Sequence, residues 1–204
     1  MKYRDTMTLL ATLIMGSSTF GQGQQALRSP SIAGGVSQTW AQDENFSKLV
    51  LNSPLIVKGK VVHLEAARLP TKFGNSVSTD SDVEIEATYK DLQGVNAKAI
   101  TVFQLGGVLD DLVVENRQNP TLKVGEEYIL ILRPCGMDGK SLWCVAQNKG
   151  RFQLVDGIAY QKQKPSDAFE PRQKAYLESQ GYPTDVPEAE LVGKILQAER
   201  SASE

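Results

Sequence analysis

The sequence predicts a mainly β protein, a small Greek-key barrel of the OB type with five to six strands, a short N-terminal helix and C-terminal helices. Three observations support this fold class. Apolar runs of strand length, separated by turn signals, recur between residues 55 and 161. Gly59 interrupts the first long run, as the bend of a small barrel requires. A long polar stretch, residues 108–122, separates the third strand from the fourth, as in a Greek-key barrel.

The first residues have the composition of a signal peptide. Lys2 and Arg4 precede a short apolar run, Met7–Met15, and small polar residues follow. The run is too short to span a bilayer, which needs about 20 residues. We therefore predict a signal peptide over residues 1–23 and a secreted or periplasmic protein with no transmembrane segment after cleavage. A buried N-terminal helix is the alternative.

The rest of the chain divides into a linker, a barrel domain and a helical extension. Residues 24–42 contain many Gln, Gly and Ser residues, which is typical of a flexible linker. Residues 43–161 form the predicted OB-like domain, which begins with a helix over Asp43–Leu51. Residues 162–204 form the helical C-terminal extension. The whole chain carries a net charge of −2, so no basic field points to a nucleic acid.

Alternation and apolar runs place the strands of the barrel. The continuous run Tyr128–Leu132 is typical of a strand that is buried on both faces. Residues 70–81 and 108–122 are polar, and we expect loops there. Seven segments have the pattern of strands, and we expect five to six of them to form the barrel: Leu55–Leu64, Val83–Lys90, Ala99–Leu105, Tyr128–Leu132, Leu142–Val145, Arg151–Val155 and Ile158–Gln161.

The two cysteines, Cys135 and Cys144, flank a predicted turn between two strands. If Asp138 and Gly139 form a two-residue turn, Cys135 faces Leu142 and the cysteines are diagonal neighbours, roughly 7–8 Å apart. A four-residue loop would instead place the cysteines opposite each other, where a disulfide fits. We favour the second register and a disulfide, with two buried free thiols as the alternative. Two Cys and one His are too few for a usual zinc site, and no metal is predicted.

Two helices are predicted in the C-terminal extension, Pro171–Gln180 and Pro187–Arg200. Asp185 is the expected cap of the second helix, with Glu188 completing a capping box. This helix has an apolar stripe, which we expect to pack on the barrel rather than to bind a partner. The stripe consists of Leu191, Val192, Ile195 and Leu196.

Four segments in order carry a resemblance: SKLVLNSPLIVKGKVV, VFQLGG, LKVGEEYILIL and NKGRFQLV. Together they resemble a group of uncharacterised exported bacterial proteins whose barrel is similar to that of tissue metalloprotease inhibitors and netrin modules. The residues on matching positions are Gly59, Gly106, Gly107, Gly125, Glu126, Gly150 and Phe152. We expect structural roles for the five glycines among them. Inhibitory chemistry is not implied, because those inhibitors use an N-terminal Cys and no Cys precedes Cys135 here.

Candidate catalytic and metal-binding residues are few. His63 is the only histidine, lies in a predicted strand and has no nucleophile motif beside it. Glu84 and Glu86 share one strand face, where a solvated surface is the simpler interpretation. Asp110, Asp111 and Glu115 lack the spacing of an EF-hand. We therefore predict no catalytic residue, no cofactor and no enzyme activity.

The predicted function is that of an exported, non-catalytic module that binds a protein or an envelope component through the barrel face or the 108–122 loop. The alternatives are an envelope structural or assembly factor that uses its C-terminal helix, and an enzyme of unrecognised type. Nucleic-acid binding by an OB barrel needs aromatic platforms in a basic groove. We expect Phe103, Trp143 and Phe152 to pack in the core instead.

Overall fold

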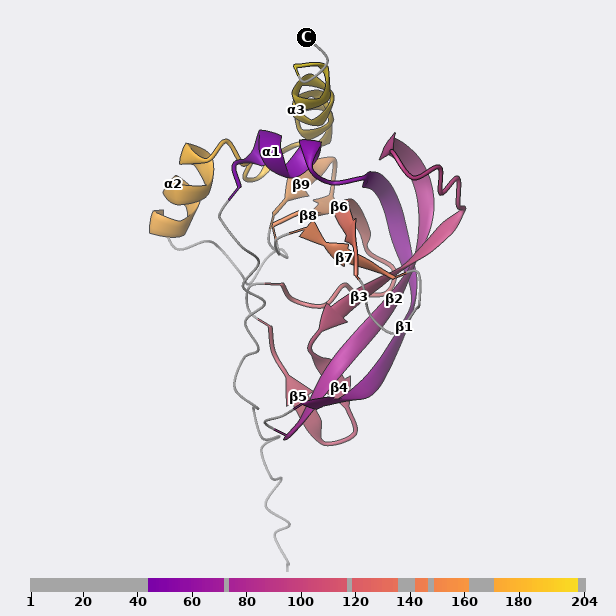
Figure 1. Cartoon of the computed structure of the whole chain (residues 1–204). Helices are drawn as coiled ribbons and strands as arrows, with labels where there is room; N and C mark the ends of the chain where they lie inside the picture. Colours follow the sequence, from indigo (N-terminus) through magenta and orange to yellow (C-terminus); the bar gives the residue numbers. More distant parts are fainter. Residues whose placement is uncertain are drawn as a thin grey trace, which may run out of the picture.

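The computed structural model describes residues 44–71, 74–116, 119–135, 142–146, 149–161 and 171–201 (Figure 1). The predicted signal peptide and linker lie outside the described residues. The helices are α1 (Phe46–Leu51), α2 (Pro171–Ser179) and α3 (Glu188–Arg200). The strands are β1 (Leu55–Thr71), β2 (Gly74–Asp91), β3 (Ala99–Leu105), β4 (Gly107–Leu109), β5 (Leu112–Val114), β6 (Glu127–Pro134), β7 (Trp143–Val145), β8 (Arg151–Val155), β9 (Ile158–Tyr160) and β10 (Val186–Pro187).

The protein is mainly β, and its large sheet is barrel-like, which is the predicted fold class. Strands follow the order β1-β2-β3-β7-β6-β8-β9-β10, and β6 also pairs with β1, so the pairings return to the first strand. The contact between β3 and β7 is parallel and consists of only two residue pairs, whereas the neighbouring pairings are antiparallel. The barrel is therefore not fully closed at this point.

Strand β6 separates two hydrophobic cores. Tyr128, Leu130 and Leu132 point into the barrel, where they join residues of β1, β2, β3 and β7. Ile129 and Ile131 point the other way, into a cluster that includes residues of all three helices. All five side chains are completely buried. The continuous apolar run in the sequence is thus explained by burial on both faces, as predicted.

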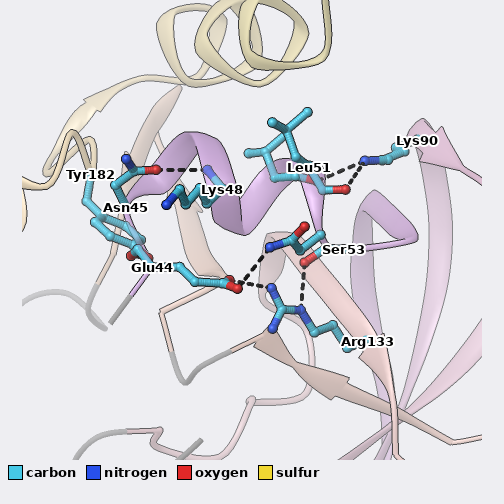
Figure 2. A network of polar contacts seen from close by, with 10 residues as sticks. Glu44, Asn45, Lys48, Leu51, Ser53, Lys90, Arg133 and Tyr182 are labelled. Atoms are coloured by element: carbon cyan, nitrogen blue, oxygen red, sulfur yellow. Dashed lines mark hydrogen bonds and ion pairs between the residues drawn. The ribbon is translucent and has the colours of Figure 1, made fainter. Parts of the chain in front are cut away.

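Helix α1 is held at both ends by polar contacts (Figure 2). Asn45 caps its N-terminus by accepting a hydrogen bond from the backbone N–H of Lys48. Buried Lys90 of β2 donates to the carbonyl oxygens of Val50 and Leu51 at 2.9 and 3.0 Å. These carbonyls form the negative end of the helix, which stabilises a cation. The same ammonium group is 2.8 Å from a carboxylate oxygen of Glu199 in α3. Lys90 therefore ties α1 and α3 to the sheet.

A second polar cluster fixes the chain just before α1. Arg133 of β6 donates to Glu44 at 2.6 Å and to Ser53 at 3.3 Å (Figure 2). The hydroxyl of Tyr182 donates to the carbonyl oxygen of Glu44 at 2.8 Å. These contacts link residues from both ends of the described chain and keep the helices at one end of the barrel.

Helix α3 packs on the rest of the protein, as the sequence predicts. Leu191, Ile195 and Ala198 are buried in the helix-side core, whereas Leu196 remains 41% exposed. The predicted cap is wrong. Pro187 occupies the cap position without a side-chain hydrogen bond, because residues 186 and 187 pair with β9 as strand β10. Asp185 therefore lies too far from the helix to cap it.

Glu188 binds across to the barrel instead of completing a capping box. Its carboxylate accepts a hydrogen bond from Lys58 of β1 at 2.9 Å. This hydrogen bond is the main reason that the pKa of Lys58 is raised, since it favours the charged ammonium group. The contact is a second link between α3 and the sheet.

The turn from β2 to β3 is organised by one carboxylate. Asp91 accepts hydrogen bonds from the backbone N–H groups of Asn96 and Val95 at 3.0 Å and of Gln93 at 3.2 Å. These donors, Asn96 first, lower the pKa of Asp91, because they bind its ionised form. Gly94 and Asn96 have positive φ angles, as the predicted turn here requires.

Two predicted loops are wrong. Most of residues 70–81, expected to be a polar loop, belong to a long hairpin in which β1 has 17 residues and β2 has 18. The stretch 108–122 contains a short hairpin, β4–β5, which turns at Asp110 and Asp111. In both places backbone pairing and packing against other strands stabilise an extended chain that shows little apolar alternation.

The disulfide between Cys135 and Cys144 is present, but the favoured register is wrong. Arg133 pairs with Cys144, and the N–H of Cys135 donates to the carbonyl oxygen of Leu142, so the cysteines are diagonal neighbours. Their Cα atoms are nevertheless only 5.4 Å apart. Cys135 lies one residue beyond the end of β6 and keeps the register of the ladder, and the diagonal between the two cysteines is short enough for the disulfide. The predicted turn residues 138 and 139 lie outside the described residues.

Candidate functional site

The β1–β2 hairpin extends beyond the barrel. Residues 62–71 and 74–82, which we call the arm, project from the end opposite the helices, beside β4 and β5 (Figure 1). β1 departs from regular pairing just before the arm. Val61 pairs with Val83 and His63 with Asp82, which leaves Val62 as a bulge. The bulge changes the course of the strand where it leaves the barrel.

The two faces of the arm differ. In β2, Val77, Thr79 and Ser81 lie on the same face as Val83, which belongs to the barrel core. Their partners in β1 are Arg68, Ala66 and Leu64, in that order. This is the inner face. The other residues form the outer face, which carries His63, Glu65, Ala67 and Leu69 from β1 and Ser76, Ser78, Asp80 and Asp82 from β2.

The β4–β5 hairpin covers the inner face and fixes its position. The N–H of Gly106 donates to the carbonyl oxygen of Val77 at 2.8 Å, and the hydroxyl of Thr79 donates to the carbonyl oxygen of Gly106 at 2.7 Å. Gly106 and Gly107 both have positive φ angles, and a Cβ atom on Gly107 would lie 2.2 Å from the Thr79 hydroxyl oxygen. Arg68 pairs with Asp110 in the β4–β5 turn at 3.3 Å. Only glycine fits this approach of the two hairpins.

The outer face is acidic near the barrel, whereas toward the tip of the arm Ser76 and Ser78 are buried and Leu69 packs with the disulfide cluster. Asp80, Asp82, Glu84 and Glu86 alternate along β2, and exposed Glu65 lies opposite Asp80. Asp82 accepts a hydrogen bond from the hydroxyl of Thr101 at 2.8 Å. Glu86 is 3.9 Å from the ammonium group of Lys58. Over the arm itself, therefore, the acidic groups outnumber the cationic ones on this face.

The free edge of β1 is the third feature of the arm. β6 pairs with β1 only as far as Lys60, and Val61 then exchanges backbone hydrogen bonds with Gly125 and Glu126. From residue 62 to residue 70, β1 pairs with β2 alone among the segments that the structure describes. An unpaired strand edge of this kind offers backbone donors and acceptors to another chain.

The direction of those backbone groups follows from the ladder. Val77 points its carbonyl group away from β1, toward Gly106. In an antiparallel pair both opposite residues point their backbone groups outward or both point them inward, so Arg68, the partner of Val77, points outward. By alternation, Ala66 and Leu64 do the same. The edge thus presents three N–H and carbonyl pairs in a row.

The sequence-based candidates do not converge on one catalytic centre. His63 is exposed on the outer face of the arm, and Glu84 and Glu86 are exposed farther along β2. Asp110 and Asp111 form the β4–β5 turn, and Glu115 follows β5. Among the described residues, no group of three or more His, Cys, Asp or Glu side chains could hold a metal ion. No helix in the described part of the chain is long and apolar enough to cross a membrane.

The remaining glycines and aromatic residues have structural positions. A Cβ atom on Gly59 would lie 2.4 Å from the carbonyl oxygen of Glu84, at a register shift of β1, and one on Gly150 would lie 2.6 Å from the carbonyl oxygen of Ile131. Gly125 lies in the exposed turn beside Val61. The side chains of three aromatic residues are buried, as predicted, namely Phe103, Trp143 and Phe152. Phe103 packs in a small cluster with the disulfide.

A buried polar cluster behind the arm was missed from the sequence. The side-chain amide of Gln104 donates to Asn119 and to the carbonyl oxygen of Pro120, both at 3.0 Å, and accepts from the N–H of Leu122 at 2.8 Å. Arg151 also donates to the carbonyl oxygen of Pro120. A Gln within an apolar strand was the one available signal, because a buried amide needs hydrogen-bond partners. The cluster anchors the chain between β5 and β6.

A buried tyrosine lies near this cluster. The hydroxyl of Tyr128 donates to the carboxylate of Glu126, and burial, followed by this hydrogen bond, raises the pKa of Tyr128 well above its usual range. The tyrosine therefore remains neutral and serves as a donor that holds the turn before β6.

No protein-family model matches the chain, and no curated protein matches its sequence. Three features define the arm: a strand edge with which no described segment pairs, an outer face that is acidic near the barrel, and an inner face covered by a second hairpin.

Proposed function

We propose that the protein is an exported, non-catalytic module that binds a protein or an envelope component through the arm. The observation that carries this proposal is the free edge of β1 from residue 62 to residue 70, which projects away from the helices. Natural proteins usually cover, shorten or twist such an edge, because it promotes association. An edge of this length on an ordered arm is consistent with a binding role.

The disulfide supports the exported location. Cys135 and Cys144 are bonded, and disulfides persist mainly in secreted and periplasmic proteins. Export is tested by the intact mass of the protein recovered outside the cytoplasm. The expected mass lacks about 21–23 N-terminal residues and the two hydrogens lost on disulfide formation. A full-length, reduced mass would contradict export.

The arm is preferred over the C-terminal helix as the binding element. The apolar residues Leu191 and Ile195 of α3 are fully buried against the rest of the protein, so this stripe is already occupied. The arm, in contrast, exposes His63, Glu65 and Ala67.

The test is site-specific photocrosslinking in the host, with the full chain. A photoreactive residue at Ala67, exposed on the arm, is compared with one at Leu196, exposed on α3. We expect one defined crosslinked product from position 67 and none from position 196. Equal products at both positions, or none at position 67, would contradict binding through the arm.

A further inference from the structure

The backbone of β1 gives the arm a specific way to bind. Leu64, Ala66 and Arg68 direct their N–H and carbonyl groups outward, and no described segment pairs with them. A strand laid beside them would extend a sheet that is already formed by β1, β2 and β3. Addition of a strand to an exposed edge is a general mode of peptide recognition, in which main-chain hydrogen bonds supply affinity and alternate side chains supply specificity.

We propose that this edge accepts an extended segment of a partner protein as an added strand, and that the segment presents basic residues on one face and apolar residues on the other. The inference rests on the proposed binding function and adds the chemistry of the partner. The added strand would run beside Leu64 to Arg68 and continue the arm by one strand.

The charge of the outer face selects basic residues. An added strand would place alternate side chains on the same face as Glu65. Asp80 lies opposite Glu65 in β2, and Asp82 follows two residues later on the same face. Opposite charges directly across a strand pair are favourable, and like charges are not. A Lys or Arg opposite Glu65 is therefore favoured over an acidic residue.

The inner side of the edge selects apolar residues. Leu64 and Ala66 are half-buried there, and Arg68 is already paired with Asp110. At the barrel end of the edge, Val62 is 41% exposed and Val124 is 57% exposed. Val61 is hydrogen-bonded to Gly125, so Val62 and Val124 belong to neighbouring segments. Apolar side chains of the partner would remove this surface from water.

A second copy of the chain fits the edge less well. Two identical antiparallel edges related by a twofold axis keep their outer faces on the same side of the joined sheet. If the axis passed at Ala66, the two Glu65 side chains would be diagonal neighbours, and two acidic outer faces would lie side by side. The charge pattern thus favours a basic partner over self-association.

The experiment uses the full chain and acetylated, amidated seven-residue peptides. The probe has the sequence VKVKVKV, which alternates as the edge requires. KKKVVVV has the same composition and charge without the alternation, and VEVEVEV has the opposite charge. Binding is followed by amide chemical-shift changes in NMR titrations. We expect the probe to shift amides of residues 62–70 and to bind at least about tenfold more tightly than either control peptide, because the controls lose either the one-sided charge or its sign.

Two substitutions in the arm separate backbone pairing from charge. Ala66→Pro removes one outward N–H, and proline is tolerated on edge strands, whereas Ala66→Ser keeps the N–H as a matched control. We expect Ala66→Pro to weaken probe binding about tenfold or more and Ala66→Ser to leave it unchanged. Glu65→Lys should weaken binding of VKVKVKV and strengthen that of VEVEVEV. Because Glu65 is exposed, this variant tests the proposal even if the proline variant does not fold.

Several results would overturn the proposal: no probe binding, equal binding of the scrambled peptide, shifts centred away from the arm, or unchanged affinity in Ala66→Pro and Glu65→Lys. Concentration-dependent dimers that disappear in Ala66→Pro would identify a second copy as the occupant and would equally overturn it. If photocrosslinking at Ala67 still yields a partner while the peptide tests fail, strand addition is wrong and binding through the arm stands. If crosslinking also fails, the proposed function itself is contradicted.

Discussion

The packing of helix α3 leads to a quantitative prediction for Leu191→Ala. The Leu191 side chain is completely buried in the helix-side core. The substitution removes three carbon atoms, and burial of each stabilises the fold by about 0.8 kcal/mol, so the transfer loss alone is roughly 2.4 kcal/mol. The cavity left behind adds to this loss. We therefore expect the free energy of unfolding to fall by about 2.5–5 kcal/mol.

The assay is urea unfolding of the full chain, followed by far-UV circular dichroism. The midpoint should fall while the m-value stays unchanged. Leu196→Ala is the matched control on the same helix, because Leu196 is 41% exposed, and it should cost less than about 1 kcal/mol. A loss below about 1 kcal/mol for Leu191→Ala, similar to the control, would refute the conclusion that α3 is part of the core. It would favour a helix reserved for a partner.

Three further predictions concern the barrel. Gly59→Ala should destabilise the fold by about 1–3 kcal/mol in the same unfolding assay, because the added Cβ atom would lie 2.4 Å from a backbone oxygen. Gly193→Ala is the control, because a Cβ atom at this position of α3 meets open space, and it should be neutral or stabilising. Lys90→Ala should lower the free energy of unfolding by about 2–4 kcal/mol, since it removes the buried partner of two helix carbonyls and of a carboxylate. Lys194→Ala, on the surface, is the control and should lower it by less than about 1 kcal/mol. The NMR-measured pKa of the Asp91 carboxyl should lie below 3.8 in the folded protein, and Asp91→Asn should remove the corresponding loss of stability as the pH falls through that lowered pKa. An Asp91 pKa at or above 3.8 would contradict the hydrogen bonds that the backbone N–H groups of the turn donate to its carboxylate.

The central strands and the helices were predictable from the sequence because burial leaves a clear pattern there. The run Tyr128–Leu132 became β6, Ala99–Leu105 became β3, and the stripe containing Leu191 and Ile195 became the buried face of α3. In these elements, the side chains that pack in the core are the ones that show the periodicity.

The arm was not predictable in the same way. Residues 74–82 of β2 are mostly Ser, Thr, Asp and Asn, which are typical of loops. They are extended because residues 63–71 of β1 pair with all of them and because β4 and β5 cover the inner face. Pairing between distant segments is a tertiary interaction, and it overrides the local preference.

The remaining errors concern the geometry at the cysteines and two elements that are very short. The register at the cysteines was wrong because diagonal neighbours were expected to be too far apart for a disulfide, whereas the Cα atoms of Cys135 and Cys144 are 5.4 Å apart across the diagonal. The two-residue strand β10 displaced the expected cap at Asp185. In β4–β5, the signal was present as apolar residues on both sides of Asp110 and Asp111, but it was too short to stand out from a polar loop.

The measurement that tests the central claim most directly is native-state hydrogen exchange of the β1 amides by NMR, in the free protein. If the edge is unpaired, the outward amides of Leu64, Ala66 and Arg68 exchange rapidly, whereas those of Glu65 and Ala67, which point toward β2, are protected. This alternation is the predicted result. Uniform protection across residues 64–68 would show that the edge is already covered and would contradict the binding role of the arm.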